Sequence, residues 1–294
     1  MSQFLLMKKN VILIICLLYA AVLKSQVPFQ SRPTAFTIDH KEFEISLLSP
    51  TRYGVGKKTE VFSTVFLDWK LPNAGLKHLW WKKPAKKDRG FFKSRDIWFG
   101  SVHNLDYPNM FFKSVQKHKP DYIADSCIVP NVITMRNELR MSLYLRKATS
   151  CDGPDFLFTL RAGIKNSFKI KKDVTMPPVT RNPLWYRETA VCLDTIVWFV
   201  GADLDFHLTD NLNMLVDLDF YSVDWNVKDH SLESKIFVYG YAGMHHRLMI
   251  SGGIKLIAGT VYSENKYQIL PMADVSYFLK LKKKREKGLF GEMR

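Results

Sequence analysis

The most constraining feature of this chain is a series of long segments in which apolar and polar residues alternate with a period of two. Such alternation is typical of β-strands that have one apolar face and one polar face. About eleven such segments follow residue 34, and many of them extend over 10–17 residues. Strands in soluble sandwiches usually have about 5–6 residues, whereas a membrane-spanning β-strand needs about 9–11. The sequence therefore predicts an all-β fold whose strands are long enough to cross a membrane.

A sheet that crosses a bilayer must close on itself, because an open edge would leave backbone N–H and C=O groups unpaired in lipid. We therefore predict a single closed antiparallel transmembrane β-barrel. Barrels of this kind have an even number of strands, which favours 12 strands with 10 as the alternative. The strand missing from the count is expected in residues 26–35 or 105–129. Helical periodicity is almost absent after the N-terminal segment.

The connections between the strand candidates alternate between short and long. Residues 52–58, 207–211 and 243–247 form short connections, whereas 105–129 and 169–188 are long. Outer-membrane barrels have short periplasmic turns and longer outer loops. The pattern therefore predicts that the two long connections lie on the outer side of the barrel.

The first 25 residues have the layout of a secretory signal peptide. Lys8 and Lys9 precede an apolar run from Val11 to Leu23, which is too short to span a bilayer comfortably. An uncleaved N-terminal anchor is the alternative. We expect a signal peptide at 1–25, an outer-membrane barrel at 26–281 and a basic C-terminal tail at 282–294.

Two neighbouring strand candidates in residues 201–220 carry carboxylates at alternate positions. A three-residue turn at 209–211 would place Leu208 opposite Leu212 and Asp203 opposite Asp217. Two facing carboxylates are costly unless cations or water neutralise them. Lipid outside and a polar lumen with paired charges inside would satisfy both faces, whereas a half-exposed sheet of a soluble protein is the alternative. The residues expected to line the lumen are Asp203, Asp205, Asp217, Asp219, Arg136, Glu138, Arg140, Arg161, Lys165 and Lys255.

The formal net charge of +15 is concentrated in a few segments. Residues 77–95 hold eight Lys and Arg with one Asp, and residues 280–294 hold seven Lys and Arg with two Glu. An exported chain rarely meets nucleic acid, so we expect no nucleic-acid partner. Outer-membrane lipids are the expected partners, and lipid phosphates are candidates at 77–95. Both basic segments are expected on the periplasmic side, and the reversed topology would place 77–95 outside.

Two stretches of the chain carry a family resemblance. EISLLSPTRYGVGKKTEVFSTVF followed by LPNAGLKHLWW is similar to the opening hairpins of uncharacterised outer-membrane β-barrel proteins of Gram-negative bacteria. FHLTDNLNMLVDLDF resembles the short turns of such barrels. The resemblance implies an architecture and an outer-membrane location, but no activity. One departure is that ILPMADVSYFLKL, the last strand candidate, is followed by thirteen more residues, whereas such barrels commonly end on an aromatic residue.

The sequence carries no recognisable catalytic or metal-binding motif. G-x-S-x-G, H-E-x-x-H, C-x-x-C and the P-loop are absent, and we expect neither a metal nor a cofactor. We expect a small pore or transport protein, or a structural barrel with a plugged lumen. The alternatives are an outer-membrane enzyme acting on lipid, for which Ser222, His230 and Ser231 near one rim are candidates, and a soluble secreted β-sheet binding protein.

Overall fold

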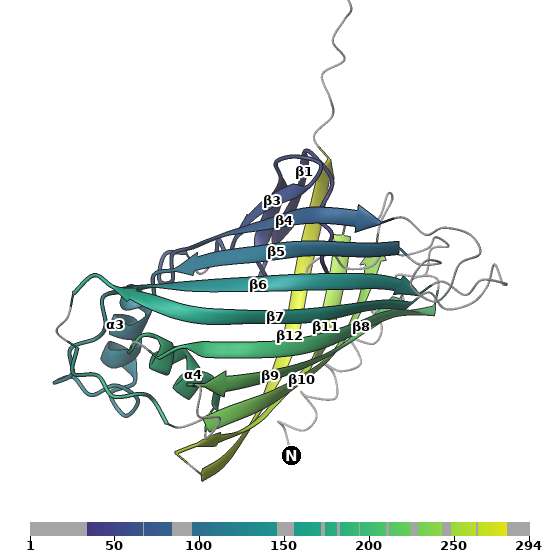
Figure 1. The fold of residues 1–294 in the computed structure, drawn as a ribbon. Coiled ribbons are helices and arrows are strands. Elements are labelled where there is room, and N and C mark those ends of the chain that lie inside the picture. Colours follow the sequence, from purple (N-terminus) through teal and green to yellow (C-terminus); the bar gives the residue numbers. More distant parts are fainter. Residues whose placement is uncertain are drawn as a thin grey trace, which may run out of the picture.

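The computed structural model describes residues 34–66, 68–83, 96–145, 156–171, 174–180, 183–193, 195–209, 212–224, 229–242, 248–262 and 264–280. In this part of the chain twelve strands form a closed antiparallel barrel, in which each strand pairs with the next and β12 pairs with β1 (Figure 1). The prediction of a closed 12-strand barrel is confirmed. The strands are β1 (Glu42–Ser46), β2 (Thr51–Gly54), β3 (Thr59–Ser63), β4 (Asn73–Lys83), β5 (Asp96–Asp106), β6 (Val132–Leu145), β7 (Phe156–Lys169), β8 (Val197–Thr209), β9 (Leu212–Val223), β10 (Asp229–Ala242), β11 (Leu248–Val261) and β12 (Glu264–Lys280).

The strand missing from the sequence-based count is β2, which lies in neither of the two expected segments. Most of it falls within residues 52–58, which the sequence analysis assigned to a short turn. With only four residues, β2 is too short to show a recognisable alternation. Residues 105–129 instead contain the helix α3 (Asn109–His118), and a second helix, α4 (Pro183–Val191), precedes β8. No described helix is long and apolar enough to cross a membrane.

The hairpin of β8 and β9 has the predicted carboxylate pairing but a different turn. Asp203 lies opposite Asp217, as predicted. Thr209 pairs with Leu212, and the register shifts between His207 and Thr209. The predicted three-residue turn with Leu208 opposite Leu212 is therefore wrong, because the irregularity in β8 absorbs one residue before the turn.

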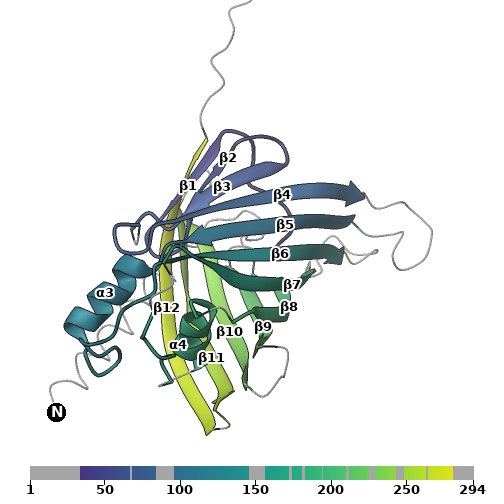
Figure 2. The ribbon, with the colours of Figure 1, turned by 60° about the vertical axis from the view of Figure 1, so that its left-hand side comes forward.

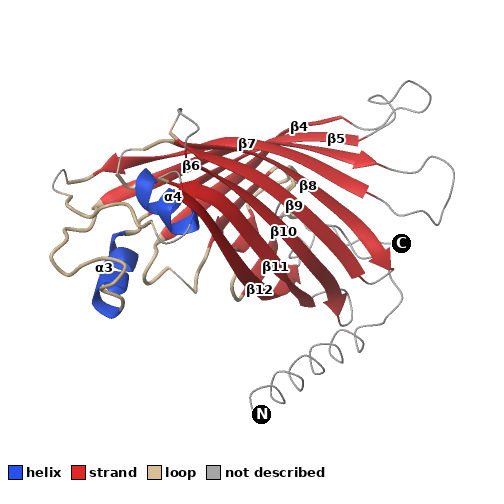
Figure 3. Cartoon of the chain, turned by 90° about the horizontal axis from the view of Figure 1, so that it is seen from below, coloured by secondary structure: helices blue, strands red, loops and turns tan. Residues whose placement is uncertain are grey.

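The connections divide between two ends of the barrel. At the end that we call the helix end, the chain connects strands through 47–50, 64–72, 107–131, 170–196, 224–228 and 262–263. Both helices lie there (Figures 2 and 3). At the opposite end, the termini end, β1 begins and β12 finishes. The two long connections thus share the helix end, and the strands that flank the basic residues 84–95 meet at the termini end.

The barrel wall has an apolar outer face and a polar inner face. Large apolar side chains such as Leu139, Val200 and Ile254 are 46–53% exposed on the outside. Their chain neighbours Glu138, Arg140 and Gly201 face inward, and the two charged side chains are buried. The side-chain period of two fixes this division along every long strand.

A segment that precedes β1, which we call the N-terminal strap (residues 34–39), enters the barrel. The backbone N–H of Ala35 donates to Ser142 Oγ at 2.8 Å, and that of Ile38 donates to Glu60 Oε2 at 2.8 Å. Ala35 is fully buried. A Cβ atom at Gly100 would lie 3.0 Å from the carbonyl oxygen of Ala35, so a glycine in the wall leaves room for the strap.

Candidate functional site: a charged lumen

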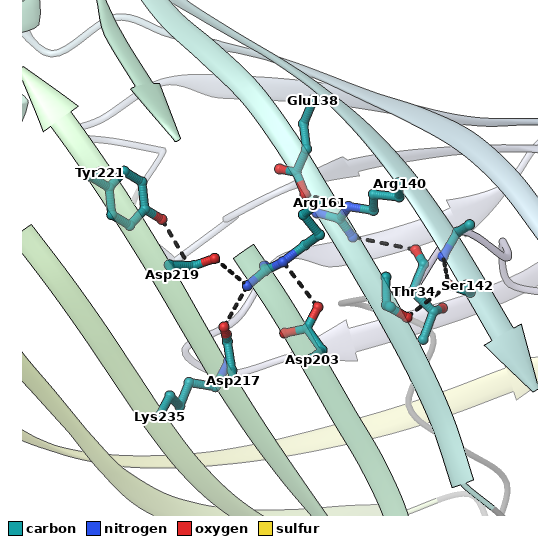
Figure 4. Close-up of polar contacts among 12 residues, drawn as sticks. Thr34, Glu138, Arg140, Ser142, Arg161, Asp203, Asp217, Asp219, Tyr221 and Lys235 are labelled. Carbon is teal, nitrogen blue, oxygen red and sulfur yellow. Dashed lines mark hydrogen bonds and ion pairs between the residues drawn. The ribbon is translucent and has the colours of Figure 1, made fainter. Parts of the chain in front are cut away.

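The centre of the lumen holds one guanidinium among three carboxylates. Arg161 projects inward from β7 and lies between side chains of β8 and β9 (Figure 4). Its Nε is 3.0 Å from Asp203 Oδ2, and its Nη2 donates to Asp217 Oδ1 at 2.5 Å and to Asp219 Oδ1 at 2.7 Å. All four side chains are at least nine-tenths buried. Arg161 therefore offsets part of the negative charge of the facing pair Asp203 and Asp217.

The register of the sheet explains how these groups meet. Arg161 lies opposite Gly201, and Gly201 lies opposite Asp219. A Cβ atom at Gly201 would lie 1.9 Å from Asp219 Oδ1. The missing side chain at Gly201 thus allows Asp219 to reach across one strand to Arg161. Lys235 on β10 adds a second cation, with its Nζ 3.5 Å from Asp217 Oδ2.

A second cluster on β6 places one carboxylate between two guanidinium groups. Arg140 Nε donates to Glu138 Oε1 at 2.6 Å, and Arg136 Nη2 lies 2.8 Å from Glu138 Oε2. The Arg136 guanidinium also lies over the Phe199 ring, 4.3 Å from its centroid. Arg140 Nη1 donates to the carbonyl oxygen of Thr34 at 3.4 Å, which connects this cluster to the N-terminal strap (Figure 4).

The helix α4 brings a third set of charges to the helix end. Arg187 Nη1 and Lys255 Nζ each lie 2.5 Å from an oxygen of Glu233. Glu188 Oε2 accepts from Lys165 Nζ at 2.6 Å. The period-two pattern contains no signal for Arg187 or Glu188, because a helix supplies both. Glu233 lies on β10 with the same inward parity as Lys235.

The ionisation of Glu188 is favoured by its neighbours. Burial opposes the charged form, but the ammonium group of Lys165 and the guanidinium group of Arg187 outweigh it and lower the pKa of Glu188 to about 2. Cys192 follows α4, and burial raises the pKa of its thiol to about 12. Glu188 is therefore a carboxylate and Cys192 a thiol at neutral pH.

A fourth cluster lies beside the strap and was also missed by the sequence analysis. Arg52 pairs with Glu44 and with Glu60, and Lys77 Nζ lies 3.9 Å from Glu60 Oε1. Lys77 is only 2% exposed. Its assignment to a basic segment 77–95 that meets lipid phosphates is therefore wrong at its first residue, because the parity of β4 turns Lys77 inward. Residues 84–95 lie outside the described part.

The structure places all ten residues predicted to line the lumen on the inner side of the wall. Nine of them form the ion pairs given above, and the tenth, Asp205, accepts a hydrogen bond from the Tyr239 hydroxyl at 2.6 Å. Lys165 is shared between Glu188 and Asp106, which lies 3.7 Å away. The arrangement is thus a series of internally compensated charges.

Both ends of the lumen are occupied by non-strand segments. At the helix end, Tyr186, Ala190 and Val191 of α4 pack against inward residues such as Phe199 and Val261. Toward the termini end, the strap fills the space beside the Glu60 cluster. A cavity of about 120 Å³, which is room for a few water molecules, lies beside Arg52, Glu60 and Lys77 and extends to Pro50.

The groups considered for catalysis are bound to other partners. The Ser222 hydroxyl donates to the carbonyl oxygen of Asp224 at 3.1 Å, and His230 Nδ1 lies 3.2 Å from Thr260 Oγ1. Ser222 and His230 lie opposite each other on β9 and β10, and in the described contacts each is hydrogen-bonded to another group. Within the described residues, no group of three His, Cys, Asp or Glu side chains is placed to hold a metal ion.

No family model matches this chain, and no curated protein is significantly similar to it. The closed 12-strand barrel is compatible with an outer-membrane β-barrel.

Proposed function

We propose that this chain is an outer-membrane β-barrel of a Gram-negative bacterium whose lumen is closed, so that it acts as a structural membrane protein and not as an open pore. In this proposal the helix end faces the outside and the termini end faces the periplasm. The expected signal peptide at 1–25 and basic tail at 282–294 lie outside the described residues.

The observation that carries the membrane assignment is the inverted distribution of side chains. A soluble barrel buries apolar residues inside and exposes polar ones. Here Glu138 is buried in an ion-pair cluster while its neighbour Leu139 is 53% exposed. Lipid is the solvent that makes this arrangement favourable along a whole wall, because it accepts apolar side chains and the closed sheet satisfies the backbone. A soluble secreted β-protein would leave the same wall in contact with water.

The closed lumen favours a plugged barrel over a pore. The strap is held by hydrogen bonds to Ser142 and Glu60, and α4 is held by the ion pair of Arg187 with Glu233. The clusters between them are largely compensated internally and, among the described residues, leave no continuous row of unpaired charges for a solute. Channels of larger barrels are water-filled, whereas small barrels can be filled by their side chains.

A matched pair of substitutions tests the membrane assignment. Leu139 lies near the middle of β6, and Met110 lies on α3 outside the wall; both are about half exposed. An arginine on the lipid face near the membrane midplane costs about 2–4 kcal/mol, whereas a surface substitution in water usually changes stability by less than about 0.5 kcal/mol. We expect Leu139→Arg to reduce the outer-membrane, heat-modifiable form on SDS gels and Met110→Arg to leave it unchanged. Equal behaviour of the two variants would contradict the proposal.

Conductance in planar bilayers tests the closed lumen. The full-length protein, purified from the outer-membrane fraction, should insert without producing steady current. A steady open current from the same preparation would show that the barrel is a pore and contradict the structural role. It would not contradict the membrane assignment.

A further inference from the structure

The helices α3 and α4, with the ends of strands β5, β6 and β7, enclose a pocket at the helix end. The pocket has a volume of about 290 Å³. It lies beside the plugged lumen and is formed mainly by segments outside the barrel wall. Its floor shares Lys165, Glu188 and Asp106 with the charges at the helix end of the lumen, and the apolar walls beside them call for a separate explanation.

The walls of the pocket are aromatic and apolar. Phe111 of α3 and Trp185 of α4 have nearly parallel rings, with an interplanar angle of 17° and centroids 5.6 Å apart. Phe112, Leu71 and Leu184 complete these walls. Ring faces carry negative charge density, so a cation held against them is attracted.

The floor of the pocket is polar: its lining has more negative than positive groups, and Arg187 lies outside this lining with its Nε 3.4 Å from Glu188 Oε1. Asp106 and Glu188 are both carboxylates in the lining, and Lys165 lies between them as the ammonium group. The side chain of Glu188 is 38% exposed, whereas that of Lys165 is 18% exposed. The side chain of Asp106 is 16% exposed, so a ligand that enters reaches Glu188 more readily than Lys165 and reaches Asp106 about as readily as Lys165.

We propose that this pocket binds a small molecule that has an aromatic or apolar body and a protonated amine. The body would lie against Trp185 and Phe111, and the ammonium group would lie against Glu188 and Asp106. The volume is at the small end of the roughly 300–1,000 Å³ of ligand pockets. It suits a molecule of one or two rings and excludes a peptide or a glycan chain. This inference goes beyond the proposed function and does not depend on it, because the pocket is defined without reference to a membrane.

The test uses three probes of similar size that differ in their head group. 2-Phenylethylamine is a cation at neutral pH, 2-phenylethanol is neutral and 3-phenylpropionate is an anion. Binding of each to the full-length protein in detergent micelles is measured by isothermal titration calorimetry. We expect the amine to bind at least tenfold more tightly than the alcohol or the acid. Equal affinities, or a preference for the acid, would overturn the proposal.

Variants then assign the binding to the pocket. Asp106→Asn and Glu188→Gln each remove one negative charge from the floor, and together they should weaken amine binding at least tenfold. Trp185→Leu should weaken binding of the amine and of the alcohol. Glu264→Gln is the matched control, because Glu264 is an exposed carboxylate at the same end of the barrel, paired only with Lys266 in the described contacts. Heat-modifiability on SDS gels confirms that each variant is folded. Amine binding that Asp106→Asn, Glu188→Gln and Trp185→Leu all leave unchanged would refute the site.

Discussion

Removing the central guanidinium should be the most damaging single change in the lumen. Arg161→Met keeps much of the apolar stem but leaves Lys235, paired with Asp217, as the remaining cation in the described ion pairs of Asp203, Asp217 and Asp219. At an effective dielectric constant of about 20, each contact near 3 Å corresponds to roughly 5 kcal/mol of gross attraction. Desolvation offsets most of this, and removing one partner of a buried pair typically costs about 3–5 kcal/mol.

We therefore expect Arg161→Met to lower the free energy of unfolding by about 3–5 kcal/mol, a large part of the roughly 5–15 kcal/mol that stabilises a typical domain. The assay is urea unfolding of the barrel in lipid vesicles, followed by tryptophan fluorescence. The matched control is Lys255→Met. This variant removes the same charge from the same lumen, but Glu233 keeps Arg187 at 2.5 Å.

The double variant Arg161→Met with Asp219→Asn separates charge from packing. Removing one of the stranded carboxylates should restore part of the lost stability, because the cost comes from unpaired buried charge. If Arg161→Met and Lys255→Met are equally mild, within about 0.5 kcal/mol of the original protein, then the central cluster is hydrated and the reasoning is refuted.

Two further predictions concern α4 and the wall. Glu188→Gln should destabilise the protein at neutral pH. The folded-state pKa of Glu188 lies near 2, below its ordinary value of 4.5. The stabilisation is therefore present above about pH 4.5 and disappears as the pH falls toward 2. If the difference in unfolding free energy between the original protein and Glu188→Gln does not shrink on acidification, the ion pair with Lys165 is contradicted. Gly201→Ala should cost about 1–3 kcal/mol through overpacking against Asp219, whereas Gly252→Ala, whose Cβ would approach only the carbonyl oxygen of Met272 at 3.7 Å, should be neutral in the same unfolding assay.

The sequence determined which face each long strand turns inward, because a side-chain period of two leaves only two choices per strand. Asp203 and Arg161 could therefore both be assigned to the inner face. Which cation meets which carboxylate depends on register and on missing side chains such as that of Gly201, and these are set by non-local pairing. Lys77 belongs to a run of basic residues. Counting charge along that run does not show that its position on β4 turns the side chain inward.

Some of the elements that the sequence did not reveal have too few residues to show a period. The four residues of β2 and the nine of α4 (Pro183–Val191) are examples. The helix α4 places Arg187 next to Glu233, and the connection that contains α4 shows no alternation of apolar and polar residues. The strap is likewise defined by contacts of Ala35 and Ile38 with distant strands, which no local pattern encodes.

The pairing of β1 with β12 fixes the order in which this protein can be assembled. Only five residue pairs, from Glu42 with Lys280 to Ser46 with Ser276, join the first strand to the last, whereas β6 and β7 share fourteen. Closing so long a loop adds about 0.6 kcal/mol for each doubling of its length, so local hairpins form before the seam. The wall is therefore completed only when the last strand pairs with the first. A chain that ends before β12 would consequently give an open sheet and not a smaller barrel.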